Sequence, residues 1–422
     1  MEEFLMIHGG KPLRGSVSPS GSKNASVAIL PAALLSEEKV AIENLPDIRD
    51  VHVLENILRA LGARIEYSPG QMTVDSRSVE SCVACEELTS QMRASYYLLG
   101  AMLGRFGEAR IAMPGGCKIG ARPIDQHLKG MEALGADIEL TDTEVIARAH
   151  GGRLKGAEVY FDIVSVGATA NVLMAAARAV GRTTIVNAAK EPHIVDLANF
   201  LNSMGANIKG AGTDVIRVNG VDSLHASTYA VIPDQIETGT FMIAGAATGG
   251  DVTVTNVIPT HMESMTAKLE EMGVFIEEGE DSIRVVGTGR HRGTSVRTMP
   301  YPGFPTDLMQ PLSALMALAT TRSRIEENIF ENRFMHFDAL RSMGAQIRVI
   351  QPGRVAEIDG VPKLHGAEVI ASDLRAGAAL VIAGLAAEGE TLIGGLTHID
   401  RGYDHLEDKM RALGADIQRI RR

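Results

Sequence analysis

The chain has 422 residues, enough for two large domains or several smaller ones, and its hydrophobic content of 45% excludes a disordered polymer. Aromatic residues make up only 4% and tryptophan is absent, so any core must be built from aliphatic side chains and methionine. The 41 basic and 52 acidic side chains give a net charge of −11, which argues against a general nucleic-acid-binding protein. No apolar run approaches the ~18 residues needed to cross a bilayer, and the three cysteines are typical of a reducing cytoplasm. We therefore expect a cytoplasmic protein with neither nucleic-acid nor membrane partners.

The first expected elements are a strand over residues 4–7, an apolar helix over 23–35 and a second strand over 41–44. A helix that is apolar on every side is buried, and its small side chains let neighbouring helices approach closely. Five further segments share this composition, and a clear strand with alternating valine and threonine covers 252–256. The six apolar segments are 23–35, 93–103, 167–179, 238–247, 307–319 and 375–387.

A second pattern alternates with these helices and marks a helix that ends and leads directly into a strand. Its first copy is LRALGARIE at 58–66, and its last is MRALGADIQ at 410–418. Leucine and methionine at helical spacing indicate a buried face, and the glycine is typical of a left-handed residue that ends a helix. The central glycines of successive copies are 68 to 73 residues apart, so the chain contains six copies of a repeat of about 70 residues. They are Gly62, Gly135, Gly205, Gly273, Gly344 and Gly414.

The six repeats predict an α/β fold of two similar domains with three repeats each. One repeat contains two helices and several short strands in about 70 residues. We expect the first domain to cover residues 22–230. The second is expected to be discontinuous, with residues 231–422 joined by 1–21, whose strand would complete it across the linker. A cleft between two domains is the usual place for a ligand, so we expect the active site there.

The most informative segment for chemistry is 113–123, MPGGCKIGARP. Three glycines in six positions predict a mobile loop with accessible backbone amides. Cys117 in this loop lies near Lys118 and Arg122, and nearby positive charge favours the reactive thiolate. The alternative is a surface turn with an incidental cysteine, and composition alone leaves both interpretations open.

Charged residues recur where the apolar helices begin. Lys23, Arg93, Asp307 and Arg375 occupy corresponding positions in four of the repeats. The simpler explanation is helix capping and solvated helix ends. A cation at the positive end of a helix is nevertheless unfavourable unless an anion lies there, and converging helix N-termini with Lys and Arg form an anion site. The pattern therefore predicts a phosphorylated or carboxylated substrate.

Other candidate sites are weaker. Polar segments at 331–336 and 398–403 suit either functional loops or solvated turns with salt bridges. Cys82 and Cys85 form a CxxC pair, but no second pair follows, so zinc is not expected and a redox pair is the remaining alternative. Neither a GxxxxGK[ST] loop nor a GxGxxG turn occurs in a strand–helix context, and the histidines show no metal-ligand spacing. We expect no metal and no cofactor.

Nine motifs resemble those of the enolpyruvyl transferases, and the likeness runs from end to end. The most specific is PGGCKIGARP at 114–123, which favours the cell-wall branch, UDP-N-acetylglucosamine 1-carboxyvinyltransferase. The resemblance implies two inside-out α/β barrels, each of three βαβαββ units. The other motifs are SGSKNA (20–25), LPDIRDV (45–51), SVGAT (165–169), NAAKEPHIVDLANFL (187–201), PYPGFPTDLMQP (300–311), ENRFMHF (331–337), DLRAGAALVIAGL (373–385) and HIDRGY (398–403).

The resemblance also implies the chemistry. The enolpyruvyl group of phosphoenolpyruvate would pass to the 3′-hydroxyl of UDP-N-acetylglucosamine through a tetrahedral ketal, with release of phosphate. This is the first committed step of peptidoglycan synthesis, on which cell shape and cell division depend. By the same likeness, Cys117 is the proton donor, forms a covalent adduct with phosphoenolpyruvate and is the target of fosfomycin, and Asp307 is the candidate base.

Further residues carry implied binding roles. Lys23 and Asn24 would contact phosphoenolpyruvate, and Arg122 and Arg401 would hold its phosphate. Arg333 and Arg375 would belong to the surrounding cationic wall. The implied contacts to the UDP-sugar are Arg93, Arg122, Pro123, Ile124, Asp125, Gln126, Ser165, Val166, Gly167, Asp307 and Ile329.

The sequence departs from the family pattern at two positions near these contacts. Gln126 stands where leucine is more familiar, and Ser22 stands where alanine or glycine is common before Lys23. Two alternative functions stay open. One is transfer to shikimate 3-phosphate, as in 3-phosphoshikimate 1-carboxyvinyltransferase, and the other is a non-catalytic paralogue that binds the UDP-sugar and regulates a partner. The sequence does not fix the oligomeric state, and a monomer is consistent with it.

Overall fold

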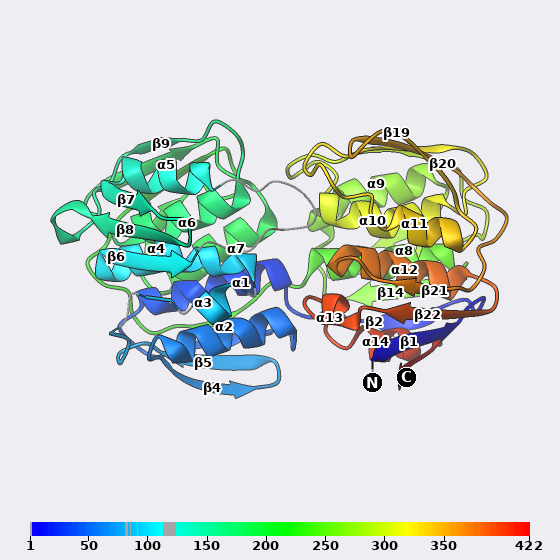
Figure 1. Ribbon diagram of the computed structural model, residues 1–422, viewed down its shortest axis with the longest axis horizontal. Coiled ribbons are helices and arrows are strands. Elements are labelled where there is room, and N and C mark those ends of the chain that lie inside the picture. The colour runs from blue at the N-terminus through cyan, green and yellow to red at the C-terminus, as the bar shows by residue number, and fades with distance from the viewer. Residues whose placement is uncertain (1, 81–82, 85, 91, 113–123) are drawn as a thin grey trace. The chain divides into compact units, whose positions relative to one another are not determined.

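The structure is a computed structural model, and it describes residues 2–80, 83, 84, 86–90, 92–112 and 124–422. Within these limits, residues 21–232 form one compact unit, called the first unit, and residues 2–20 and 233–422 form the second unit. Each unit has its own hydrophobic core. Figure 1 shows the first unit in blue to green and the second in green to red, with the blue N-terminal strands in the second.

The first unit alternates short strands with helices. Its elements are α1 (Lys23–Ala32), η1 (Ala33–Leu35), β3 (Val40–Glu43), α2 (Arg49–Ala60), β4 (Arg64–Ser68), β5 (Gln71–Asp75), α3 (Glu86–Thr89), η2 (Arg93–Tyr96), α4 (Tyr97–Phe106), β6 (Glu108–Ala112), α5 (Asp125–Ala133), β7 (Ala136–Leu140), β8 (Glu144–Ala149), η3 (His150–Gly152), β9 (Glu158–Tyr160), α6 (Val166–Ala177), β10 (Arg182–Val186), α7 (Pro192–Ser203), β11 (Asn207–Lys209), β12 (Val215–Asn219) and β13 (Thr228–Ala230).

The second unit has the same alternation, and it includes the first two strands of the chain. Its elements are β1 (Glu3–His8), β2 (Arg14–Val17), α8 (Gln235–Ala247), β14 (Asp251–Thr255), η4 (Pro259–His261), α9 (Glu263–Glu271), β15 (Phe275–Glu278), β16 (Ser282–Val286), β17 (Ser295–Arg297), α10 (Thr306–Met316), β18 (Ser323–Glu326), α11 (Phe337–Ser342), β19 (Gln346–Gln351), β20 (Val355–Asp359), β21 (Glu368–Ile370), α12 (Leu374–Ala386), β22 (Glu390–Gly394), α13 (Leu396–Ile399), α14 (Leu406–Ala412) and β23 (Asp416–Arg421).

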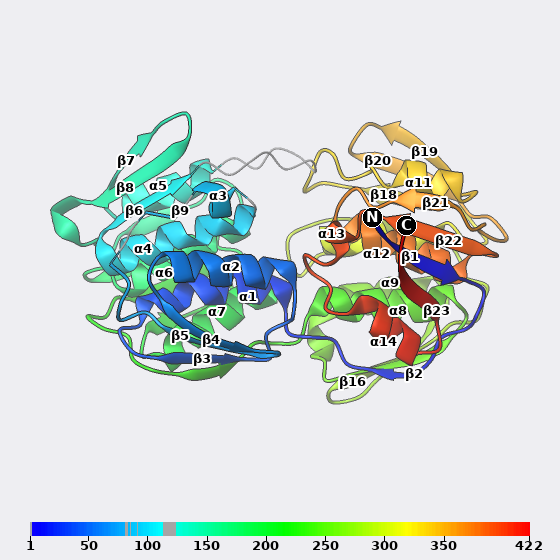
Figure 2. The ribbon, with the colours of Figure 1, turned by 60° about the horizontal axis from the view of Figure 1, so that its bottom comes forward.

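Apolar helices fill the centre of each unit, as the sequence predicted. In the first unit α4 packs against both α1 and α6, and every residue of α6 from Ala168 to Ala177 is buried. In the second unit α8, α10 and α12 pack against one another, and α12 is buried from Arg375 to Leu385. Figure 2 shows the strands on the outside of these helices within each unit. This arrangement confirms the expected inside-out α/β fold.

The sheets follow one repeated connection. In the repeat β9–α6–β10–α7–β11–β12, the pair β9 and β10 is parallel, whereas β12 pairs antiparallel with β10 and β11. Five sheets have four described strands and one has three. In that last sheet Val83 forms a parallel bridge with Arg110 of β6, where the other sheets have their parallel edge strand. The strand orders are β13-β3-β5-β4, β6-β8-β7, β11-β12-β10-β9, β15-β16-β14-β2, β17-β18-β20-β19 and β21-β22-β1-β23.

The six repeat glycines end helices as predicted. Each lies two residues after the end of α2, α5, α7, α9, α11 or α14. All six have φ between 84° and 104°, the left-handed region in which a side chain is strained. The glycines therefore redirect the chain from each outer helix into the strand that follows.

The N-terminal strand lies inside the sheet of the last repeat. Strand β1 pairs antiparallel with β22 on one side and with β23 on the other. Phe4 lies opposite Ile420, so the two ends of the chain meet in one sheet, and both termini are close together in Figure 1. Strand β2 likewise pairs with β14, and the second unit is thus built from both ends of the sequence.

A buried carboxyl in the first unit makes its stability depend on pH. Asp196 in α7 is 1% exposed, and burial raises its pKa from 3.8 to about 6, although Tyr229 and Ile232 donate hydrogen bonds to it. Because the folded-state pKa is raised, the protonated Asp196 carboxyl stabilises the fold. This contribution to the unfolding free energy is complete below the unfolded-state pKa and is lost as the pH rises through about 6. Two pKa units correspond to ~3 kcal/mol of unfolding free energy.

As the pH rises from 4 to 8, we expect the wild type to lose up to ~3 kcal/mol of unfolding free energy. Asp196→Asn, which mimics the protonated carboxyl, should not show this loss. Urea denaturation at several pH values measures this difference. Asp222→Asn is the matched control, because the Asp222 side chain is 92% exposed. The same pH dependence in the wild type and in Asp196→Asn would contradict the assignment.

Candidate active site

Lys23 begins α1 in the first unit, at the N-terminus predicted from the sequence. The Ser22 hydroxyl caps this helix by accepting a hydrogen bond from the Ala25 N–H at 3.3 Å. The Lys23 Nζ lies 3.4 Å from Asp50 Oδ2, in the first turn of α2. The Asp50 side chain is only 3% exposed, against 16% for Lys23. Asp50 thus supplies a protein anion for this cation, while Lys23 and the neighbouring Asn24 remain partly accessible.

Asn171, in the middle of the buried helix α6, connects three parts of the first unit. Its Nδ2 donates to the Tyr96 carbonyl at 2.9 Å, and its Oδ1 accepts from the Gly100 N–H at 2.7 Å. The same Nδ2 lies 2.8 Å from Nδ1 of His127. Burial and, to a lesser extent, the charge of Arg93 lower the pKa of His127 to about 4. The ring is therefore neutral at pH 7, with Nδ1 as the acceptor and the proton on Nε2.

The start of α6 is held closely against this histidine. Ser165 caps the helix, since its Oγ accepts from the Ala168 N–H at 3.3 Å. A Cβ atom at Gly167 would lie 2.8 Å from both Cε1 and Nε2 of His127. A side chain at this second residue of α6 would therefore force the helix start or the His127 ring to move.

The side-chain amide of Gln126 forms hydrogen bonds with other groups of the protein. It is 5% exposed, and its Nε2 donates to Asp125 at 2.9 Å and to Asp162 at 3.2 Å. Its Oε1 accepts from the Asp162 N–H at 2.9 Å, and Lys129 forms an ion pair with the same Asp162 at 2.7 Å. Glutamine at this position therefore ties the start of α5 to the segment that leads into α6.

The second unit contains a buried ionic cluster around Asp307, in the first turn of α10. Arg333 Nη2 donates to Asp307 Oδ1 at 2.8 Å, and Arg375 Nη2 donates to Oδ2 at 3.0 Å. The two arginine side chains are 4% and 3% exposed, whereas Asp307 is 24% exposed. The two guanidinium groups thus fix both carboxylate oxygens and leave part of the group accessible.

Arg401 follows α13 in the same unit and is half-buried. Two residues later the buried Tyr403 places its hydroxyl 2.9 Å from Thr240 Oγ1, and its ring centre lies 5.4 Å from Arg375 Cζ. Ile329 is half-buried in the segment after β18. The second unit therefore brings Asp307, Arg333 and Arg375 into direct contact and links the Arg401 segment to them through Tyr403.

Several predicted residues lie outside the part of the chain that the structure describes. They include the cysteine implied to be the proton donor and its charged neighbours. These residues are Cys82, Cys85, Cys117, Lys118, Arg122 and Pro123.

Comparison with known proteins identifies the family. A profile of the family described as EPSP synthase (3-phosphoshikimate 1-carboxyvinyltransferase) matches residues 7–410. The chain belongs to this enolpyruvyl transferase family. It is 57% identical over 421 residues to UDP-N-acetylglucosamine 1-carboxyvinyltransferase 3 of Caldanaerobacter subterraneus, covering 100% of both chains. It is 58% identical over 418 residues to UDP-N-acetylglucosamine 1-carboxyvinyltransferase of Clostridium botulinum, covering 99% of both.

A solved structure supports the same assignment. The chain is similar to the enolpyruvyl transferase NikO from Streptomyces tendae, with 30% identity, a TM-score of 0.87 and coverage of 99% of each chain. The likeness thus extends over nearly the whole of this enolpyruvyl transferase.

Two residues of the site were not predicted from the sequence. Asn171 could have been found, because an amide in the run VGATANVLMAAA must find partners in an apolar core. Asp50 could not, since acidic residues near helix starts are common and usually exposed. Only the fold shows that Asp50 is buried.

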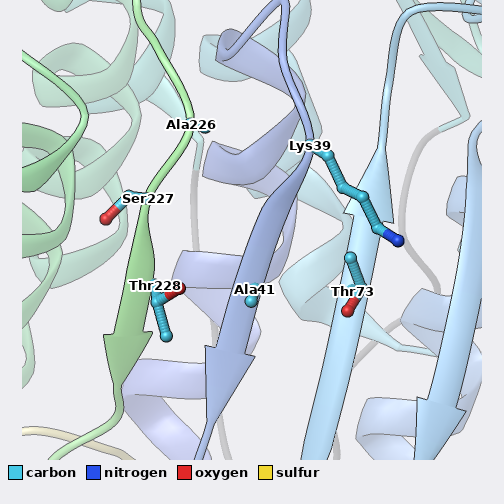
Figure 3. A pocket seen from close by; sticks show the side chains of 6 residues that line it. All are labelled: Lys39, Ala41, Thr73, Ala226, Ser227 and Thr228. Carbon is cyan, nitrogen blue, oxygen red and sulfur yellow. The ribbon is translucent and has the colours of Figure 1, made fainter.

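Two shallow hollows lie on the outer faces of sheets in this enolpyruvyl transferase. Figure 3 shows the larger, across β13, β3 and β5. The other crosses β2, β14 and β16, and neither contains a residue of the candidate site. Among the described residues no group of three or more His, Cys, Asp or Glu side chains suits a metal, and none of the described helices is long and apolar enough to cross a membrane. The residues lining the larger hollow are Lys39, Ala41, Thr73, Ala226, Ser227 and Thr228.

Proposed function

We propose that this enolpyruvyl transferase moves the enolpyruvyl group of phosphoenolpyruvate to the 3′-hydroxyl of UDP-N-acetylglucosamine and releases phosphate. The observation that carries the proposal is 57–58% identity, over at least 99% of the chain, to proteins named for this transfer. The reaction is the first committed step of peptidoglycan synthesis. The family profile is described by the 3-phosphoshikimate reaction, but the full-length relatives favour the UDP-sugar as acceptor. We also propose a cytoplasmic location and a monomer.

The chemistry proceeds by addition and elimination. A proton is added to the methylene carbon of phosphoenolpyruvate, and the deprotonated 3′-oxygen bonds to the adjacent carbon to form a tetrahedral ketal. The new methyl group then loses a proton, and the bond from carbon to the phosphate oxygen breaks. Cys117 is our proposed proton donor, and Asp307 is our proposed base for the 3′-hydroxyl.

The geometry around Asp307 supports this role. A base must hold its oxygen at hydrogen-bond distance from the proton that it takes, so a fixed carboxylate has the advantage of being in place before the substrate arrives. The hydrogen bonds from Arg333 and Arg375 fix the group. Its 24% exposure leaves it open to a hydroxyl donor.

Both substrates are anions, and each unit carries cations that suit them. In the first unit we propose that Lys23 and Asn24 bind phosphoenolpyruvate. We propose that Arg401 of the second unit and Arg122 hold its phosphate, because arginine matches the planar geometry of phosphate and carboxylate. Arg333 and Arg375 contribute to the positive surroundings, although Asp307 already balances part of their charge. The residues proposed to contact the UDP-sugar are Arg93, Arg122, Pro123, Ile124, Asp125, Gln126, Ser165, Val166, Gly167, Asp307 and Ile329.

Phosphate release tests the proposed function. The purified chain with both substrates is expected to release one phosphate for each enolpyruvyl-sugar formed, and shikimate 3-phosphate in place of the UDP-sugar is expected to give none. Folded protein that releases no phosphate with either acceptor would favour the non-catalytic alternative, and release with shikimate 3-phosphate would favour the other branch of the family.

The close contact between α6 and His127 gives a prediction about the UDP-sugar. Gly167→Ala would place a methyl group 2.8 Å from the His127 ring, so the helix start must move. Overpacking of this kind costs ~1–3 kcal/mol, and we expect the KM for UDP-N-acetylglucosamine to rise about tenfold while kcat changes little. The double variant Gly167→Ala/His127→Ala removes the clash and should recover part of the loss. Unchanged steady-state constants in Gly167→Ala would contradict the assignment of Gly167.

A further inference from the structure

Glu327 is a fully buried carboxyl that none of the roles above uses. It follows β18 directly, two residues before Ile329, and its exposure is 0%. None of the ion pairs found among the described residues includes it. A buried carboxylate of this kind is stable only when hydrogen bonds replace its lost hydration.

Four neutral donors satisfy Glu327. Its Oε1 accepts from Thr298 Oγ1 at 2.9 Å. The same oxygen accepts from the Ile329 N–H at 2.7 Å and the Phe330 N–H at 3.0 Å. Its Oε2 accepts from Thr306 Oγ1 at 2.8 Å. One side chain thus holds both the segment that carries Ile329 and the first residue of α10.

The bond to Thr306 leads directly to the ionic cluster. Arg333 Nη1 donates to Thr306 Oγ1 at 3.1 Å, while Nη2 of the same guanidinium donates to Asp307 at 2.8 Å. A hydroxyl has a single proton, so Thr306 gives that proton to Glu327 and offers a lone pair to Arg333. Glu327 therefore determines the orientation of the hydroxyl to which Arg333 donates. Phe330, whose N–H donates to Glu327, also has its ring centre 5.2 Å from Arg333 Cζ. Glu327 is thus connected to this arginine both through Thr306 and through Phe330.

We propose that Glu327 is a positioning residue for the transfer reaction, which sets Asp307 and Arg333 through the Thr306 hydroxyl and shapes the 328–330 segment through its backbone amides. This inference rests on the proposed function. Glu327 itself touches neither substrate in this scheme.

The isosteric change Glu327→Gln tests the proposal. A glutamine oxygen still accepts from the two backbone amides, but its NH2 group then faces Thr306. The threonine hydroxyl would have to accept from both this new amide and Arg333, and it would lose its own acceptor. A displacement of about 1 Å costs up to ~10²-fold in rate, and we expect kcat to fall between tenfold and a hundredfold. We expect the KM for UDP-N-acetylglucosamine to rise and the KM for phosphoenolpyruvate to stay within twofold.

A double-mutant cycle separates positioning from general loss of structure. Thr306→Val removes the connecting hydroxyl, so Glu327→Gln in that background should cost kcat less than threefold further. Thr306→Ser keeps the hydroxyl and is the matched control, expected to retain at least half of the wild-type kcat. If Glu327→Gln does not fold, the proposal is decided by Thr306→Val, which must lose at least tenfold in kcat while Thr306→Ser does not.

The outcomes distinguish this inference from the function on which it rests. An inactive wild-type chain overturns the proposed function. An active wild type with Glu327→Gln within twofold of its kcat, or with effects of Glu327→Gln and Thr306→Val that simply multiply, overturns the positioning role alone. An equal rise in both KM values would likewise indicate a merely structural role and overturn it.

Discussion

Replacement of Asp307 by alanine is expected to lower both the stability and the turnover of the enzyme by large factors. The change leaves the guanidinium groups of Arg333 and Arg375 buried, at 4% and 3% exposure, without their carboxylate. Removing one partner of a buried ion pair costs ~3–5 kcal/mol, because the remaining charge is neither paired nor hydrated. Loss of the proposed base lowers kcat by a further ~10²–10⁴-fold. Urea denaturation and steady-state kinetics measure the two effects.

One further variant separates charge from shape at this position, and a second provides the control. Asp307→Asn keeps an acceptor oxygen and the packing, so we expect a smaller loss of stability but a similar loss of turnover. Asp338→Ala is the matched control in the same unit, since it breaks a 2.6 Å ion pair with Arg341 whose carboxylate side chain is 88% exposed. Exposed pairs contribute about 0–1 kcal/mol. If Asp307→Ala were as stable as Asp338→Ala and within tenfold of wild-type turnover, the described role of the cluster would be wrong.

Replacement of Cys117 by alanine is expected to remove most of the turnover and to spare binding of the UDP-sugar. General acid catalysis contributes ~10²–10⁴-fold, so kcat should fall within that range while the Kd for UDP-N-acetylglucosamine stays within twofold. Cys117→Asp retains a proton donor and should keep activity, but it cannot be alkylated by fosfomycin. Mass spectrometry of the wild type should find an adduct of phosphoenolpyruvate mass on the Cys117 peptide.

The other two cysteines provide the controls for this experiment. Cys82→Ala and Cys85→Ala change the same side chain elsewhere in the sequence, and we expect both to keep wild-type turnover and fosfomycin sensitivity. A loss of less than tenfold in Cys117→Ala, or an adduct on Cys82 or Cys85 instead, would contradict the role of Cys117 as proton donor.

The helices of this fold were predictable because their signals are local. Small apolar residues marked the central helices, and the repeat glycines marked the ends of the outer ones, all with positive φ. Both signals act within a few residues of the chain. The pairing of β1 with β22 and β23 was not determined by any local signal, because it joins residues about 400 positions apart.

The candidate site was predictable in part for the same reason. Lys23, Asp307 and Arg375 were recognised at helix N-termini, and that is where the structure has them. The cations at these helix N-termini predicted a substrate as the source of the anions, whereas the fold supplies Asp50 to Lys23 and Asp307 to Arg375. The second of these ion pairs depends on which repeats lie next to one another. Asp307 and Arg375 are 68 residues apart, and only the packing of α10 against α12 brings them together.

The place of β1 sets an order of events on the ribosome. Residues 21–232 are contiguous, so the first unit can close while the remainder is still being translated. Strand β1 precedes its partners β22 and β23 by about 400 residues, and it pairs with β23 between Glu3 and Arg421. The nascent chain must therefore keep an apolar strand unpaired while these residues are translated, so the second unit closes only after its last repeat has been made.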